Sequence, residues 1–333
     1  LSTTVSKPKI APAALAALQA LLTASPRIRA KLRPAPPANH SGMLGDFSFP
    51  GFDAPEQKSQ EPPPPPPPTF KETDPQFWKQ IATFDPTGNI STLSLSANRL
   101  HDLCLKGVFA SAGLLETARV LDLANTDLTA EDIAGILSHC SPTKLQQLHL
   151  GGNALGDEGM EVLAGVLPRL NLDMVALRYN DIGPGGAAVL SELILGGCSW
   201  NILYMEGNPL GDEGAKAMAK SLANLKEVYL GQTRIGIEGA KALATEVLSS
   251  ESRLQKLFLE GNDLQDEGAR AFWELLEQKT DPSERKLERL YVDNNGIHKD
   301  NMLRLGKALN SITMVGVGME YQQTTGDATG RNQ

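Results

Sequence analysis

Residues 145–155 read LQQLHLGGNAL, and this spacing of leucines around an asparagine recurs along most of the chain. Two further clear copies are ISTLSLSANRL at 90–100 and LQKLFLEGNDL at 254–264. Weaker copies keep the spacing but replace some leucines or the asparagine, and their second apolar positions are Leu121, Val175, Leu203, Val228 and Leu290. The string occurs eight times in all, so a repeat architecture is predicted.

Each copy predicts a strand followed by a turn. Leu148 and Leu150 are separated by one residue, which is the period of a strand with one buried face. The asparagine slot, Asn153 in this copy, stands where the chain leaves the strand. A short amide there can hydrogen-bond the backbone groups that the turn leaves unpaired. Thr126 and Thr233 fill the slot in two copies and still carry a hydroxyl for part of that role.

The residues between copies predict helices. Successive copies are 25 to 33 residues apart, which leaves room for a helix after each strand. Acidic pairs recur where these helices would begin, in GDEG at 156–159 and 211–214 and in QDEG at 265–268. Carboxylates there meet free N–H groups and the positive end of the helix dipole. Recurrence at one position of the repeat favours this helix-start role over metal binding or acid–base catalysis.

These strings, followed by amphipathic stretches such as 160–167, resemble the ribonuclease-inhibitor type of leucine-rich repeat. The resemblance implies an α/β fold, a leucine-rich-repeat solenoid or horseshoe of about eight to nine strand–helix repeats. Its parallel sheet would line the concave side, with the helices outside. We expect the solenoid over residues 89–320, including a degenerate terminal unit at 312–317, and a polar C-terminal tail over 321–333.

The chain before the repeats has a different composition. Residues 1–86 contain 17 of the 22 prolines, including the uninterrupted run Pro62–Pro68. We predict an extended Pro-rich N-terminal arm over residues 1–72 with a short helix near 12–24, then an N-terminal cap helix over 73–88. The arm would lie either on a partner or on its own solenoid. Its predicted partner-binding residues are Leu15, Leu18, Leu22, Arg27, Arg29, Lys31 and Arg33.

The charge is unevenly distributed. The chain has a formal net charge of −8, but residues 1–45 contain six basic and no acidic residues, so the remainder carries −14. An acidic solenoid argues against nucleic acid as a ligand, because phosphate contacts dominate such binding. The basic stretch 27–33 has a second interpretation as a peripheral contact with an anionic membrane surface. No run of about 18 apolar residues occurs, so no transmembrane helix is predicted.

The residue types that carry chemistry are scattered. Cys104, Cys140 and Cys198 are too few for a disulfide framework or a metal knuckle, and we interpret them as buried thiols in a reducing compartment. The five histidines fall in different units or loops, and no Gly-rich phosphate loop follows a strand. We therefore predict a protein that is not an enzyme and has no catalytic residues, cofactor or metal.

The outward-facing positions of the predicted strands form the candidate site. Four aromatic residues occupy equivalent positions on adjacent strands and should form a ladder on the concave face: Tyr204, Tyr229, Phe258 and Tyr291. Two positions after these residues, and after Ala176 on the preceding strand, lie Arg178, Glu206, Gly231, Glu260 and Asp293. Aromatic anchors with a charged border are typical of a protein-binding patch, and we predict that it receives a basic segment. The alternative is that the aromatic pairs only stabilise the sheet.

The solenoid, the basic Ala-rich start and the proline run together resemble, in size and layout, a family of mitochondrial proteins. These are the leucine-rich-repeat associated subunits of the F-type ATP synthase of chlorophycean green algae. The resemblance implies a non-catalytic scaffold subunit of the peripheral stalk, which braces the stator and holds two enzyme copies together through contacts with other subunits.

The start of the chain bears on location. Leu1 is not an initiator methionine, and we expect that an upstream piece has been lost, as from an organellar precursor. The predicted location is mitochondrial, peripheral to the inner membrane on the matrix side, with the plastid or the cytoplasm as alternatives.

Two regulatory families offer alternatives to the stalk subunit. GTPase activators for Ran share the repeat type but carry a strongly acidic C-terminal tail, whereas residues 322–333 contain only Asp327 and Arg331 as charged residues. A binder similar to ribonuclease inhibitor is the other alternative, although that family is rich in cysteine and this chain contains three.

Overall fold

Strands and helices alternate along the chain. The computed structural model describes residues 82–84, 90–96, 115–278 and 286–309. Their strands are β1 (Ala82–Phe84), β2 (Ile90–Ser94), β3 (Val120–Asp122), β4 (Gln147–His149), β5 (Met174–Ala176), β6 (Ile202–Tyr204), β7 (Glu227–Tyr229), β8 (Lys256–Phe258) and β9 (Arg289–Tyr291). Their helices are α5 (Ala130–Leu137), α6 (Gly156–Ala164), α7 (Pro184–Leu195), α8 (Gly211–Leu222), α9 (Ile237–Val247), α10 (Gln265–Gln278) and α11 (Lys299–Leu309), with a 3-10 turn η1 (Leu167–Arg169).

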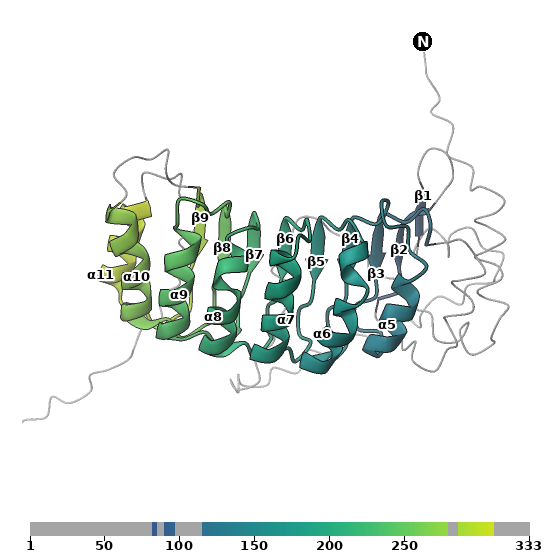
Figure 1. Cartoon of the computed structure of the whole chain (residues 1–333). Helices are drawn as coiled ribbons and strands as arrows, with labels where there is room; N and C mark the ends of the chain where they lie inside the picture. Colours follow the sequence, from purple (N-terminus) through teal and green to yellow (C-terminus); the bar gives the residue numbers. More distant parts are fainter. Residues whose placement is uncertain (1–81, 85–89, 97–114, 279–285, 310–333) are drawn as a thin grey trace, which may run out of the picture.

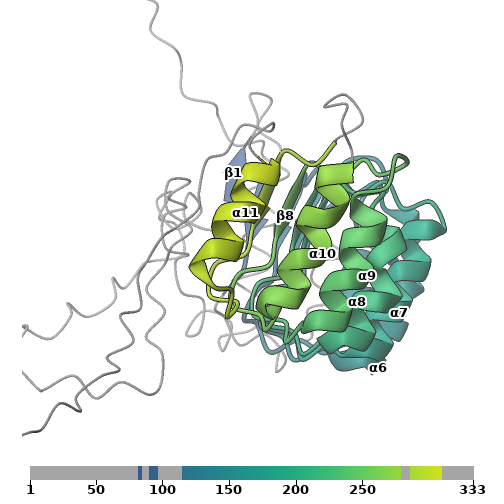
Figure 2. The same ribbon diagram turned by 90° about the vertical axis from the view of Figure 1, so that its left-hand side faces the viewer.

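The described strands form one open sheet in sequence order (Figure 1). Strands β2 to β9 are parallel, and helices α5 to α11 cover one of their faces (Figures 1 and 2). A helix is about 10 Å wide whereas neighbouring strands are about 4.8 Å apart, so a row of such units curves with the sheet on the inside. The predicted α/β leucine-rich-repeat solenoid with a concave parallel sheet is confirmed.

The register of the sheet follows the repeat string. Leu93 pairs with Leu121, and each later strand places its second apolar residue at the same height. These residues are Leu148, Val175, Leu203, Val228, Leu257 and Leu290. Equivalent positions of successive repeats therefore lie side by side. The outward-facing residues form continuous rows across the sheet, as predicted.

The N-terminal edge of the sheet differs from the prediction. The cap helix predicted over 73–88 is not what the structure shows at Ala82–Phe84, which form β1 and pair antiparallel with β2. This pairing occupies the hydrogen-bonding edge of β2 that a cap must cover. The rest of that range, the arm over 1–72, the unit at 312–317 and the tail over 321–333 lie outside the described residues.

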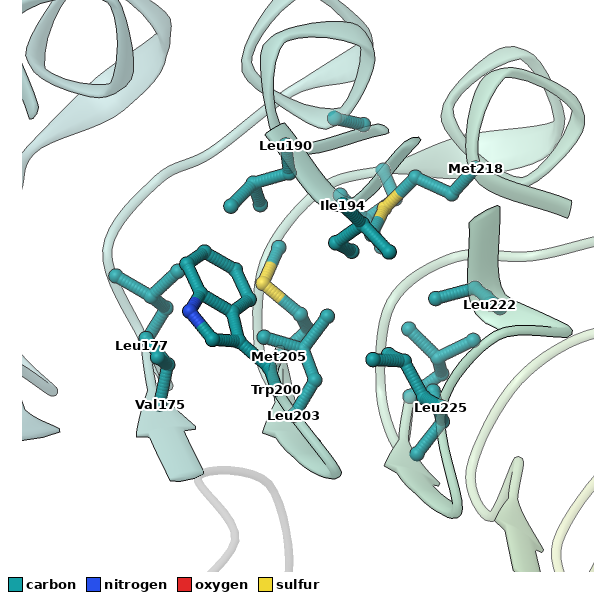
Figure 3. Packing of buried hydrophobic residues seen from close by; sticks show 14 of the residues in the cluster. Val175, Leu177, Leu190, Ile194, Trp200, Leu203, Met205, Met218, Leu222 and Leu225 are labelled. Atoms are coloured by element: carbon teal, nitrogen blue, oxygen red, sulfur yellow. The ribbon is translucent and has the colours of Figure 1, made fainter. Parts of the chain in front are cut away.

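The core lies between the sheet and the helices. Strand leucines and helix side chains of successive repeats form one continuous cluster of buried residues. In Figure 3, Trp200 lies between Val175 and Leu177 of one repeat and Leu203 and Met205 of the next. No repeat can bury its own apolar face, so each repeat depends on its neighbours for stability.

The asparagine slot joins neighbouring repeats. Asn153 Nδ2 donates to the carbonyl oxygens of Leu150 at 2.8 Å and of Leu123, in the preceding repeat, at 2.9 Å. Its Oδ1 accepts from the backbone N–H of Thr126 at 3.0 Å, and the Thr126 hydroxyl donates to the Leu123 carbonyl at 2.7 Å. The predicted turn role of both residue types is confirmed, and the amide also links two repeats, which the string did not indicate.

The acidic residues in the first turns of the helices have a different role from the predicted one. Asp157 lies in the first turn of α6, but its carboxylate accepts hydrogen bonds from the backbone N–H groups of Gly183, at 2.6 Å, and Gly185, at 3.1 Å, at the start of α7. The N-cap of α6 itself has no side-chain hydrogen bond. Asp212 and Asp266 likewise cap the N-termini of the following helices, α9 and α11. Each of these three aspartates therefore caps the helix after its own. We call this link between two neighbouring helices a clasp.

The clasps recur at every second helix junction of the described chain. Helices α7, α9 and α11 carry Pro184, Ile237 and Lys299 where α6, α8 and α10 carry the clasping aspartate. The structural unit is therefore a pair of repeats, which explains why acidic pairs appear in alternate copies of the string.

Candidate protein-binding site on the concave face

The four predicted aromatic residues form a continuous stack. The ring centroids of Tyr204 and Tyr229 are 4.2 Å apart, those of Tyr229 and Phe258 4.0 Å, and those of Phe258 and Tyr291 4.4 Å. The last two pairs are nearly parallel, with interplanar angles of 8° and 6°. All four are half-buried, on the sheet face opposite the helices. We call them the aromatic ladder. The predicted arrangement is confirmed, while its role in binding stays a prediction.

An arginine extends the ladder at one end. The guanidinium carbon of Arg178 lies 4.0 Å from the centroid of the Tyr204 ring. Its Nε donates to Glu206 Oε1 at 2.9 Å, and both side chains keep about a quarter of their surface exposed, 26% and 21%. The small side chain of Ala176, at the ladder position of the preceding strand, leaves this ring face to the arginine.

Three acidic residues beside the ladder, Glu206, Glu260 and Asp293, are partly buried, and we call them the acidic row. Burial raises the pKa of Glu206, although the Arg178 guanidinium opposes this shift. Burial, with the nearby Asp293 and Glu206 charges, raises the pKa of Glu260 to about 7. Burial also raises the pKa of Asp293. Glu206 Oε2 is buried and accepts no hydrogen bond from the described residues. The row therefore holds carboxylate oxygens that a cationic donor would stabilise.

A second charged row on the other side of the ladder was missed by the sequence analysis. Glu227 accepts from Lys256 Nζ at 2.7 Å and from the Tyr229 hydroxyl at 3.1 Å. Arg289 occupies the same row on β9 and is exposed. Each of these residues precedes a ladder residue by two positions, so the same two-residue alternation that located the ladder could have found them. The ladder thus runs between a mixed, partly basic row and an acidic one.

The remaining predicted residues are not brought to this face. The predicted partner-binding residues of the arm lie outside the described residues, as does Cys104. Cys140 is buried, and burial raises the pKa of its thiol to about 12. Cys198 is half-buried, and its pKa is also raised by burial. Neither thiol is activated as a nucleophile by its surroundings.

The described residues contain neither a candidate metal site nor a membrane-spanning helix. Within residues 82–84, 90–96, 115–278 and 286–309, no group of three or more His, Cys, Asp or Glu side chains could hold a metal ion. None of the helices described there is both long and apolar enough to cross a bilayer.

Comparison with known proteins agrees with the fold. A family model described as a leucine-rich repeat matches residues 141–164, 201–219 and 254–272. The bovine protein "NACHT, LRR and PYD domains-containing protein 3" (Bos taurus) is 32% identical over 200 residues, which is 56% of this chain and 19% of that protein. Mouse ribonuclease inhibitor (Mus musculus) is 29% identical over 207 residues, which is 59% of this chain and 44% of the inhibitor. The chain thus spans less than half the length of either relative.

A solved structure is also similar. The leucine-rich repeat-containing protein LegL7 from Legionella pneumophila aligns over 68% of this chain and 92% of its own, with 16% identity and a TM-score of 0.36. With a TM-score this low, the likeness adds nothing to the fold described above.

The register, the asparagine links and the matched segments define a leucine-rich-repeat protein. Its relatives include ribonuclease inhibitors, so the chain is a leucine-rich-repeat protein with ribonuclease-inhibitor-like homologues. The function class that these relatives support is a protein–protein interaction scaffold.

Proposed function

We propose that this protein is a non-catalytic scaffold that holds a protein partner on its concave face, between Arg178 and Tyr291. The observation that carries the proposal is the aromatic ladder with its poorly solvated acidic row. Stacked rings offer a large contact area and lose little conformational entropy on binding, because they are already held by their neighbours. The acidic border complements a basic segment of the partner.

The alternative, that the ladder only stabilises the sheet, accounts for the rings but not for the carboxylates. Cross-strand stacking does stabilise a sheet. However, burial raises the pKa of Glu206, Glu260 and Asp293, which means that their charged forms are disfavoured in the free protein. At the equivalent position, other repeats have the uncharged residues Ala124 and Gly151. Charges retained at an energetic cost are more common at functional sites.

The finer proposal concerns the assembly. We propose that the partner is another subunit of a large mitochondrial complex, and that the chain is a structural subunit of the peripheral stalk of an F-type ATP synthase, on the matrix side of the inner membrane. Its support is compositional: residues 1–45 contain six basic and no acidic residues, and residues 62–68 are seven consecutive prolines. The basic stretch 27–33 would then also approach the anionic membrane surface.

A second candidate function is supported by the relatives. The chain is 29% identical to mouse ribonuclease inhibitor over 207 residues. A soluble binder that blocks a basic partner enzyme would use the same face. This candidate differs from the first in its partner, which would be a single protein instead of a multisubunit assembly.

The experiment compares two variants of the full chain purified from its native source. The first combines Tyr229→Ala with Phe258→Ala and removes the centre of the ladder. The second, Leu195→Ala, removes a side chain of α7 that is 49% exposed, on the helix layer. We expect the first to lose its co-purifying partner and the second to keep it, with both folded by circular dichroism.

The outcomes separate the proposals. Equal retention of the partner by both folded variants would contradict binding at the concave face. If mass spectrometry of the wild-type preparation finds stoichiometric ATP synthase subunits, the stalk proposal is supported. One basic protein in their place would support the inhibitor-like binder and contradict the stalk.

A further inference from the structure

The chain already binds one of its own arginines on the ladder. Arg178 pairs with Glu206, which lies at the same position of the next repeat, and its guanidinium packs on the ring of Tyr204. Because neighbouring repeats have nearly the same backbone, a later pair of repeats can present similar surroundings. A repeat solenoid can therefore contain an occupied and an unoccupied copy of one type of subsite.

Such a copy is centred on Gly231. Two repeats after Arg178, Gly231 occupies the equivalent position. Glu260 occupies that position in the repeat after Gly231, just as Glu206 does in the repeat after Arg178. A Cβ atom placed on Gly231 would lie 3.7 Å from Glu206 Cγ and 3.9 Å from Glu260 Oε2. Two acidic side chains from either side thus converge on the space above Gly231, and Glu206 Oε2 accepts no hydrogen bond from the described residues.

We infer that the space above Gly231 is a subsite for an arginine side chain of the bound protein, whose guanidinium pairs with Glu206 and Glu260. This inference rests on the proposed function, because it assumes that the concave face binds protein. It adds a ligand group and a position, which the proposed function leaves unspecified.

The chemistry of the surroundings favours arginine over lysine. A guanidinium has five N–H donors in one plane, so it can bridge two carboxylates that face each other across a gap. It is also less strongly hydrated than an ammonium, and a half-buried site penalises it less.

The two copies differ in one respect. Ala176 leaves a face of the Tyr204 ring free for Arg178, whereas Tyr229 covers the corresponding face of Phe258. A bound guanidinium at Gly231 would therefore lie over the ring edges, held mainly by the carboxylates. The acidic side chains, more than the rings, should set the affinity of this subsite.

The test uses fluorescein-labelled hexa-arginine, hexa-lysine and hexa-citrulline peptides and the full chain, with binding measured by fluorescence anisotropy. The main variant is Gly231→Arg, which fills the subsite with an arginine of the chain itself. Its matched control is Gly151→Arg, which adds the same charge at the same position of another repeat. A Cβ atom would contact a backbone carbonyl equally closely in both, at 3.3 and 3.2 Å.

We expect hexa-arginine to bind more tightly than hexa-lysine and hexa-citrulline not to bind. Gly231→Arg should weaken hexa-arginine binding about tenfold or more, and Gly151→Arg less than about twofold. Glu260→Gln, which is close to isosteric, should weaken it as well and provides a second variant if Gly231→Arg does not fold. Equal effects of the two glycine variants, or equal affinity for arginine and lysine peptides, would overturn the subsite.

Two further outcomes have distinct meanings. If Tyr229→Ala with Phe258→Ala releases the native partner while Gly231→Arg leaves hexa-arginine binding unchanged, the subsite is refuted and the proposed function stands. If the combined change Arg27→Gln, Arg29→Gln and Arg33→Gln in the full chain increases its affinity for hexa-arginine, the arm of the chain competes for the subsite. That result would overturn its assignment to a partner protein.

Discussion

The carboxylate of Asp212, in the first turn of α8, accepts a 2.6 Å hydrogen bond from the backbone N–H of Gly236, which precedes α9. A second bond, from the Gly239 N–H at 2.9 Å, makes Asp212 a clasp between two helices. The neighbouring Glu213 lies in the same turn but pairs only with exposed Lys216 among the bonds that the structure records. Two adjacent acids therefore have different roles.

This difference predicts unequal effects on stability. Asp212→Ala should lower the free energy of unfolding by about 1–2 kcal/mol, because it removes the cap of α9. Glu213→Ala should change it by less than about 0.5 kcal/mol, as is usual for an exposed ion pair. Urea denaturation followed by circular dichroism measures both. Equal losses would show that the acids act only through the dipole of their own helix.

The asparagine slot should tolerate threonine better than alanine. Asn208 is fully buried, its Nδ2 donates to the Leu177 and Met205 carbonyls, and its Oδ1 accepts from two backbone N–H groups. Asn208→Ala should destabilise by about 3 kcal/mol, because several buried groups lose their partners. Asn208→Thr should destabilise less, since Thr233 fills the slot in another repeat and donates to a strand carbonyl. A larger loss with threonine would contradict this account of the slot.

The ring of Tyr179 leaves no space for a side chain at position 207, which is glycine. Gly207 has a φ of 72°, and a Cβ atom there would lie 2.1 Å from the Tyr179 ring. Gly207→Ala should destabilise by more than Gly211→Ala, because Gly211 has a similar φ of 59° but nothing within 4 Å of the added atom. The control should show only the backbone strain, about 1 kcal/mol. Adding Tyr179→Ala to Gly207→Ala should recover the difference, as thermal unfolding of the three variants and the wild type would show.

The acidic row should make stability depend on pH. The pKa of Glu260 rises from 4.5 to about 7, so between these values the folded protein holds a proton that the unfolded chain has released. Stability should therefore fall as the pH rises through this window. Glu260→Gln should stabilise the protein at pH 8 by on the order of 1 kcal/mol, after allowance for partial exposure, and much less at pH 5. The exposed Glu158→Gln is the control, and an equal gain at both pH values would contradict the prediction.

The sequence predicts most of the fold because its decisive signal is local and repeated. The period aligns Leu93 with Leu121 and the later strands, and the two-residue alternation then places Tyr229 beside Phe258. The contacts across the acidic row are less predictable. The bond from Arg178 to Glu206 depends on the side-chain rotamers of both residues, which the repeat string does not determine.

Other features carry no signal in a single copy of the string. The clasp between Asp212 and Gly236 joins residues 24 apart that only the stacking of repeats brings together. Strand β1 is three residues long and outside the repeat, so nothing in its sequence distinguishes it from the helix predicted there. Long-range pairing, and not local preference, decides both features.

The central claim, that the aromatic ladder contacts a protein partner, is tested most directly by photo-crosslinking in the native assembly. A benzophenone amino acid replaces Tyr229 in one preparation and the exposed Leu195 of α7 in another. The account predicts a crosslinked adduct with the partner from position 229 and none from position 195. Adducts from position 195 alone would contradict it, because the partner would then lie on the helix layer and not on the concave face.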